Sequence, residues 1–123
     1  MGQPVIHFEI LGGDAIKLQK FYADLFDWKI REPMSAEMGH YGVVEHTSSG
    51  LGGGIGAPAP GDKPLVTIYV AVPDLQAALD QAVALGGKVV TPPMVIPGMV
   101  SFAQFSDPAG NVIGLVIPEP PPA

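Results

Sequence analysis

An internal repeat with a period of 60 residues constrains the fold more than any other feature of this sequence. Residues 5–30 (VIHFEILGGDAIKLQKFYADLFDWKI) and residues 65–90 (LVTIYVAVPDLQAALDQAVALGGKVV) share one hydrophobic pattern without a gap. The same shift aligns Gly54 with Gly114, beyond the ends of these two stretches. Few aligned residues are identical, so a coincidence of two similar patterns is the alternative. The constant offset across separate stretches favours a duplicated half-domain.

Each repeat is predicted to form a strand followed by an amphipathic helix. Residues 5–11 and 65–72 are rich in β-branched and aromatic side chains, which favours strands. Asp14 and Asp74 follow as predicted N-caps, because a short carboxylate accepts the free amide hydrogens of a first helical turn. Apolar residues then recur at the spacing of one helical face, which we expect to pack on the sheet. They are Leu18, Phe21, Tyr22 and Leu25 in the first repeat and Leu75, Ala78, Leu79 and Ala82 in the second.

Three further strands are predicted in each repeat, which gives an α+β fold of two βαβββ units. They lie near residues 28–32, 40–46 and 51–56, and near residues 87–91, 99–106 and 111–117. The chain of 123 residues suits one domain. We expect that domain to cover residues 1–117, built of half-units 1–57 and 64–117. Residues 118–123 (PEPPPA) are predicted to be an extended, flexible tail, since proline has no amide hydrogen to donate to a sheet.

Composition and charge exclude several classes of function. The net charge is −6 and the six basic residues form no dense cluster, so nucleic-acid binding is not expected. The chain has no cysteine, which excludes disulfides, thiolate metal sites and a cysteine nucleophile. The N-terminal residues lack the features of a signal peptide, and no apolar run is long enough to span a membrane. We therefore expect a cytoplasmic protein without a membrane partner.

Several short motifs occur in the order found in one known superfamily. They are HFEI at residues 7–10, KFY at 20–22, LFDW at 25–28, VPDL at 72–75 and DPAGNVIGL at 107–115. With the repeat, they make the chain resemble the vicinal oxygen chelate superfamily of glyoxalases, bleomycin-resistance proteins and dioxygenases. The sequence is most similar to the small glyoxalase-like branch related to lactoylglutathione lyase. The resemblance implies two βαβββ units whose curved mixed sheets form a cleft for a small molecule, and it implies a homodimer.

The resemblance also implies four positions for metal ligands. In this sequence they are His7, Gly54, Thr67 and Gly114, and only histidine is a usual ligand of a catalytic divalent ion. We therefore predict no metal and no other cofactor.

His7 and Glu9 are the candidate catalytic residues. They are two positions apart on a strand, so both side chains point to one face. They would form an acid/base pair, or begin a rebuilt metal site, or be a cleft-lining histidine held by a neighbouring carboxylate. Thr67 and Tyr69 are their repeat equivalents and are predicted to line the binding site with them.

Four more residues have two interpretations each. The resemblance implies that Phe102 and Gln104 border the cleft and bind ligand, whereas ordinary strand packing is the alternative. His40 and His46 are six positions apart, so a regular strand would present both on one face. They would assist His7 at a metal site, or face solvent as histidines near strand ends often do.

The preferred functional hypothesis is a metal-free protein that binds a small organic molecule. It would act either as a binding protein or as an enzyme that uses His7 and Glu9 as acid and base. One alternative is a metal-dependent lyase, isomerase or dioxygenase with a rearranged ligand set that includes His7. Another is a non-catalytic interaction domain.

Overall fold

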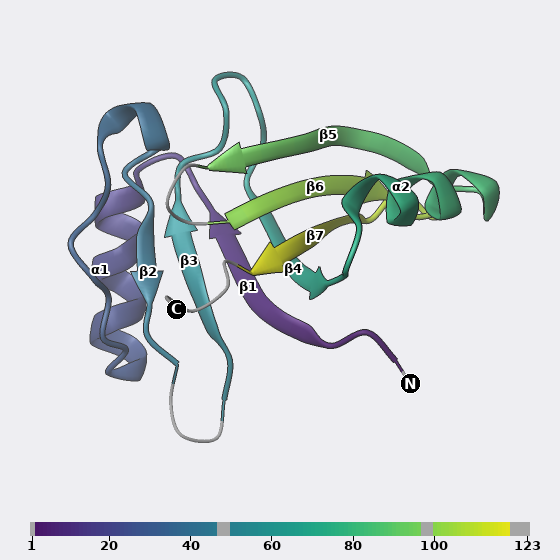
Figure 1. The fold of residues 1–123 in the computed structure, drawn as a ribbon. Coiled ribbons are helices and arrows are strands. Elements are labelled where there is room, and N and C mark those ends of the chain that lie inside the picture. Colours follow the sequence, from purple (N-terminus) through teal and green to yellow (C-terminus); the bar gives the residue numbers. More distant parts are fainter. Residues whose placement is uncertain (1, 47–49, 97–99, 119–123) are drawn as a thin grey trace. The chain divides into compact units, whose positions relative to one another are not determined.

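The computed structural model describes residues 2–46, 50–96 and 100–118 (Figure 1). The chain divides into two compact units, one spanning His7–Thr67 and the other comprising Met1–Ile6 and Ile68–Ala123. These boundaries fall inside two strands. The half-units 1–57 and 64–117 stay a prediction. Pro118 is the last residue of a strand, and the rest of the predicted tail, residues 119–123, lies outside the described residues.

The unit His7–Thr67 places one helix beside a small mixed sheet. Strand β1 (Val5–Leu11) pairs in parallel with β3 (Gly52–Gly56), and β2 (Gly42–Val44) pairs with β3 in the antiparallel direction. Helix α1 (Ala15–Phe26) lies alongside β2 and β3 (Figure 1). A short 3-10 helix, Ala36–Met38, precedes β2.

The other unit repeats this arrangement with one more strand. Strand β4 (Leu65–Ala71) pairs in parallel with β7 (Val112–Pro118). Strand β6 (Val100–Ser106) lies antiparallel to β7, and β5 (Lys88–Ile96) lies antiparallel to β6. Helix α2 (Leu75–Ala84) covers these strands with Leu75 and Leu79, which are buried against Ala103 and Leu115. The α+β class and the duplication of a strand–helix–strands unit are therefore confirmed.

The 60-residue repeat is present in the register of the parallel strands. Glu9 lies opposite Gly54, and Tyr69, sixty residues after Glu9, lies opposite Gly114. Asp14 and Asp74 both cap their helices, because their carboxylates accept from the amides of Lys17 and Ala77. The repeat is thus a property of the hydrogen-bonding pattern as well as of hydrophobicity.

The antiparallel strands depart from this repeat by one residue. Val43 lies opposite Gly54, whereas Gln104, sixty-one residues later, lies opposite Gly114. Continued by one residue beyond β2, the ladder makes Tyr41 the structural counterpart of Phe102. An offset of 60 would instead align Tyr41 with Ser101.

The predicted strand at 28–32 is wrong. Among the described residues it is reduced to one bridge between Ile30 and Val44. The segment still makes three backbone hydrogen bonds with residues 41–45, because the amide of Glu45 donates to Lys29, that of Arg31 to Val43 and that of Met34 to Tyr41. Pro33 has no amide hydrogen and interrupts the regular ladder between the last two bonds. The predicted strand at 40–46 is also shortened, to the three residues of β2.

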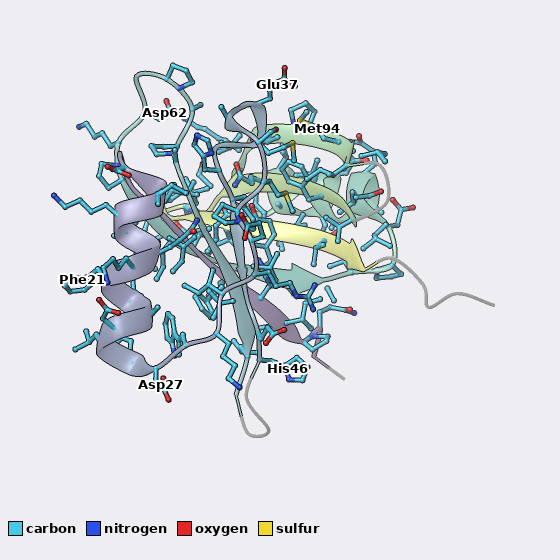
Figure 2. The ribbon with its side chains drawn as sticks, turned by 90° about the vertical axis from the view of Figure 1, so that its left-hand side faces the viewer. Phe21, Asp27, Glu37, His46, Asp62 and Met94 are labelled. Carbon is cyan, nitrogen blue, oxygen red and sulfur yellow. The ribbon has the colours of Figure 1, made fainter. Side chains whose placement is uncertain are left out.

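The predicted buried face of α1 is wrong in part. Phe21 and Leu25 are 57% and 58% exposed, and Phe21 points away from the helix (Figure 2). The buried residues are instead Ala15 and Gln19, which occupy the positions of Leu75 and Leu79 in the second repeat. The predicted face of α2 is confirmed, because Leu75 and Leu79 are buried and Ala78 and Ala82 are half-buried.

Polar burial explains the difference between the helices. Gln19 is 6% exposed, and its Nε2 atom donates to the carbonyl oxygens of His40 and Ile55, at 2.8 Å each. A buried amide is stable when it is hydrogen-bonded in this way.

No helix in the described part of the chain is long and apolar enough to cross a membrane.

Candidate functional site

The two candidate catalytic residues share one hydrogen-bond partner, the hydroxyl of Tyr41. The Nε2 atom of His7 lies 2.9 Å from this hydroxyl oxygen. The same hydroxyl donates to Oε2 of Glu9 at 3.1 Å. Strand β1 supplies His7 and Glu9 on one face, as their spacing predicts, and the residue before β2 supplies Tyr41. We call these three residues the His7 cluster.

A close approach between Tyr41 and Gly54 holds the tyrosine in place. A Cβ atom added to Gly54 would coincide with the hydroxyl end of the Tyr41 ring. The ring therefore occupies the volume that a side chain at residue 54 would need. Glycine is required here because another side chain reaches the backbone.

Burial favours the neutral form of the histidine. His7 is partly buried, and this desolvation holds the pKa of its imidazole below the ordinary value of 6.5. Near pH 7 the ring is therefore neutral and has one lone pair with which to accept a proton. Glu9, which is 9% exposed, contributes a carboxylate that accepts from Tyr41.

A second polar group lies in the other unit. Nε2 of Gln104 donates to the hydroxyl oxygen of Tyr69 at 3.0 Å, and its Oε1 accepts from the hydroxyl of Thr91 at 2.8 Å. The Tyr69 ring lies where a side chain at Gly114 would be and meets Phe102 edge to face, with centroids 6.5 Å apart. Three predicted ligand-binding residues, Tyr69, Phe102 and Gln104, are thus brought together.

The remaining predicted residues have simpler environments. Thr67 is 4% exposed at the end of the unit that contains the His7 cluster, and its role in ligand binding stays a prediction. His40 and His46 are both exposed. The expectation that one strand presents both on one face is wrong, because β2 covers only Gly42–Val44 and His40 has the left-handed φ of 49°.

The residues present do not fit the metal site implied by the family resemblance. Gly54 and Gly114 have no donor atom, and a tyrosine ring occupies the space above each glycine. In the described ranges, no three histidine, aspartate or glutamate side chains gather as a divalent metal would need. His7 and Glu9 supply two possible metal-ligand groups, and both side chains are hydrogen-bonded to the Tyr41 hydroxyl.

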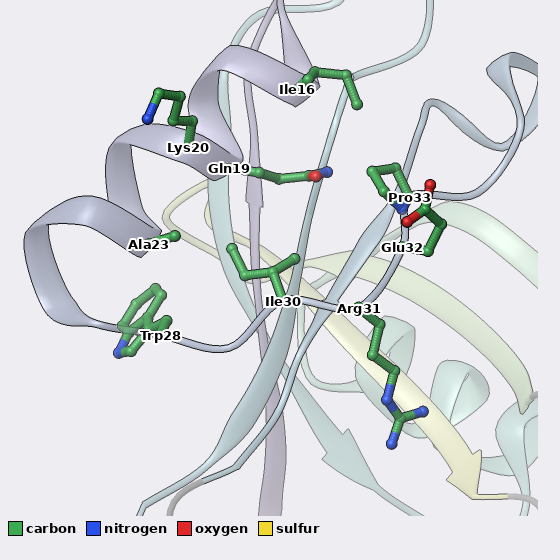
Figure 3. Close-up of a pocket in the computed structure, with 9 residues that line it drawn as sticks. All are labelled: Ile16, Gln19, Lys20, Ala23, Trp28, Ile30, Arg31, Glu32 and Pro33. Carbon is green, nitrogen blue, oxygen red and sulfur yellow. The ribbon is translucent and has the colours of Figure 1, made fainter.

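A shallow pocket of about 370 Å³ lies on the unit His7–Thr67, away from the candidate residues (Figure 3). Its lining consists of Ile16, Gln19, Lys20, Ala23, Trp28, Ile30, Arg31, Glu32 and Pro33. Lys20 pairs with Asp24 at 2.8 Å, and Arg31 pairs with Glu45 at 3.6 Å. The lining includes no member of the His7 cluster, so neither candidate catalytic residue lies in this pocket.

Comparison with known proteins decides the family. The model of the Glyoxalase/Bleomycin resistance protein/Dioxygenase superfamily matches residues 5–115. The chain belongs to this superfamily. Curated relatives include the "putative glyoxylase CFP32" of Mycobacterium bovis and of Mycobacterium tuberculosis, each 35% identical over 81 residues. This match covers 66% of the chain but only 31% of each relative, so the chain spans about a third of their length.

Solved structures with a similar fold include methylmalonyl-CoA epimerases. The crystal structure from Mycobacterium tuberculosis has a TM-score of 0.70 at 19% identity, and the match covers 94% of this chain and 88% of that one. A Streptomyces coelicolor variant in complex with 2-nitronate-propionyl-CoA has a TM-score of 0.68 at 16% identity, covering 96% and 99%. At these identities the likeness establishes the glyoxalase-like fold alone.

Sequence reasoning missed Tyr41 as a member of the site. The residue was a structural equivalent of Phe102, which the sequence did single out. The one-residue shift between β2 and β6 hid this relation, because the 60-residue offset pairs Tyr41 with Ser101. The glycine at residue 54 could have pointed to Tyr41, because a glycine inside a strand often marks a close approach of another group to the backbone.

Proposed function

We propose that this superfamily member binds a small carbonyl compound at the His7 cluster and moves a proton there without a metal. The observation that carries the proposal is the shared hydroxyl of Tyr41, which links His7 to Glu9. A neutral imidazole takes a proton, and the nearby carboxylate stabilises the cation that results. The geometry therefore supports acid/base chemistry better than simple sequestration.

The class of substrate follows from what such a base can attack. A C–H bond beside a carbonyl is acidified, because the carbonyl oxygen takes the charge left by the proton. The structural likeness to methylmalonyl-CoA epimerases supports this choice of class, although it does not identify the molecule. We therefore take methylmalonyl-CoA, methylmalonate and pyruvate as the first probes.

The alternative of a metal-dependent lyase, isomerase or dioxygenase needs at least one more ligand beside His7. The histidines that were candidates for this role, His40 and His46, are exposed and do not gather with His7 among the described residues. No observation therefore favours this alternative over the metal-free site.

The test follows the exchange of a probe's C–H hydrogen for deuterium in D₂O by NMR. We expect wild-type protein to accelerate exchange in at least one probe. His7→Gln should abolish the acceleration, because an amide is not a base at neutral pH. The matched control is His46→Gln, which removes an exposed histidine and should retain full activity.

Two results would overturn the proposal. One is the absence of exchange with all three probes. The other is exchange that His7→Gln leaves unchanged, since the proton would then move elsewhere. Saturable binding without exchange, observed by the shift of the His7 signals, would instead identify a binding protein and contradict the catalytic part.

A further inference from the structure

With the Glu9 carboxylate ionised, a count of hydrogens gives the direction of each hydrogen bond in the His7 cluster. A tyrosine hydroxyl has one hydrogen, and in this cluster it is donated to Oε2 of Glu9. The hydroxyl oxygen therefore faces Nε2 of His7 with a lone pair only, at 2.9 Å. Nε2 must then be the atom that carries the ring hydrogen.

We propose that Tyr41 is a positioning residue that fixes His7 in the Nε2–H tautomer and places the basic lone pair on Nδ1. The use of this lone pair in catalysis rests on the proposed function, whereas the tautomer itself does not. Tyr41 acts through His7 and is therefore distinct from the base. Its ring is held for this role by the close approach to Gly54.

The proton balance of a reaction step follows from the tautomer. The proton of the substrate passes to Nδ1, so the C–H bond breaks and an N–H bond forms. The electron pair of the C–H bond remains on the substrate and is delocalised to its carbonyl oxygen. Nε2 keeps its hydrogen, and the Glu9 carboxylate stabilises the imidazolium through the Tyr41 hydroxyl.

The tautomer is measurable without any ligand. Long-range ¹H–¹⁵N correlation spectra of protein labelled at histidine nitrogen distinguish the two tautomers by their nitrogen shifts. Spectra are recorded at about pH 8, well above the ordinary histidine pKa of about 6.5, so that the ring of His7, whose pKa burial lowers, is neutral. The signals of His7 are assigned as those that disappear in His7→Gln.

Wild-type His7 should show the shifts of the Nε2–H form. Tyr41→Phe keeps the ring above Gly54 but removes the hydroxyl, so the His7 signals should move toward a mixture of both tautomers. Glu9→Gln should move them in the same direction, because an amide can donate to the hydroxyl and reverse the chain. Tyr22→Phe, which removes a hydroxyl on α1 of the same unit, is the matched control and should change nothing.

An Nδ1–H form in the wild-type protein would overturn the inference. So would shifts of His7 that are identical in wild type, Tyr41→Phe and Glu9→Gln. The outcome is separate from that of the deuterium-exchange experiment, because it uses the free protein. A fixed tautomer without exchange would refute the proposed function only, and exchange without a fixed tautomer would refute the positioning role only.

Discussion

At the scale of single residues, two glycines and two tyrosines determine which side chains occupy matching positions of the repeat. Gly54 and Gly114 stand at matching positions of the repeat, and a tyrosine ring lies over each one. The two rings come from different elements: Tyr41 precedes β2, whereas Tyr69 belongs to β4. The family resemblance placed both glycines at metal-ligand positions, but the sequence did not reveal which side chains cover them.

Alanine at residue 54 should destabilise the protein. The added Cβ atom would collide with the Tyr41 hydroxyl, and overpacking of this kind costs about 1–3 kcal/mol of the free energy of unfolding. Denaturant unfolding measures the change. Gly13→Ala is the control, because a Cβ atom there meets no heavy atom within 4 Å and should alter stability by less than about 0.5 kcal/mol. Equal stability of both variants would contradict the tight contact.

Stability should depend on pH through His7. Burial lowers the pKa of His7 in the folded protein, so the unfolded chain binds the proton more tightly. The free energy of unfolding should therefore fall as the pH drops below about 6.5 toward the folded pKa, and it should be fully retained above that value. Urea unfolding of wild type and His7→Gln across this range checks the sign: the variant should lose less stability on acidification. An identical loss in both proteins would show that His7 is not buried.

At the scale of elements, the two helices show what the sequence predicts and what it does not. The caps at Asp14 and Asp74 and the buried face of α2 followed from local spacing. The buried face of α1 did not, because its central position is Gln19 and apolar periodicity does not recognise a polar core residue. Its partners, the carbonyls of His40 and Ile55, are 21 and 36 residues away, so only the folded chain brings them together.

Gln19→Leu should be destabilising, although the repeat has Leu79 at the equivalent position. Leucine would leave the carbonyl oxygens of His40 and Ile55 without this amide. The bond to Ile55 is buried, and a buried group left unpaired costs about 1–3 kcal/mol. The free energy of unfolding by denaturant measures this loss. The matched control is Gln76→Leu on α2, because Gln76 is exposed and bonds only Asp80 among the described residues. A variant at residue 19 as stable as wild type would refute the structural role of the amide.

At the scale of the whole molecule, repeat and motif order together were sufficient to predict the superfamily. The predicted βαβββ order was wrong at residues 28–32, where one bridge replaces a strand, and the strand predicted at 40–46 covers only Gly42–Val44. The candidate site was predicted less well, because its third member depends on a one-residue shift between β2 and β6 that the 60-residue repeat does not contain. Short-range patterns predict elements, whereas a site is made of residues from elements distant in the sequence.

We also expect the chain to form a homodimer, as the resemblance to its superfamily implies. Phe21, Leu25 and Phe26 on α1 are each more than half exposed, and exposed apolar surface of this kind often marks contacts between proteins. Sedimentation at micromolar concentration should give twice the chain mass of 12.8 kDa. A single species at the mass of one chain would contradict this expectation.

Under the proposed function, the His7 cluster binds and deprotonates a small carbonyl compound without a metal. The most direct test is the deuterium exchange of the probe set with protein that has been dialysed against a chelator, before and after addition of zinc, manganese or iron(II). We expect the same exchange rate in all cases and its loss in His7→Gln. Exchange that appears only after a metal is added would contradict metal-free deprotonation at the His7 cluster.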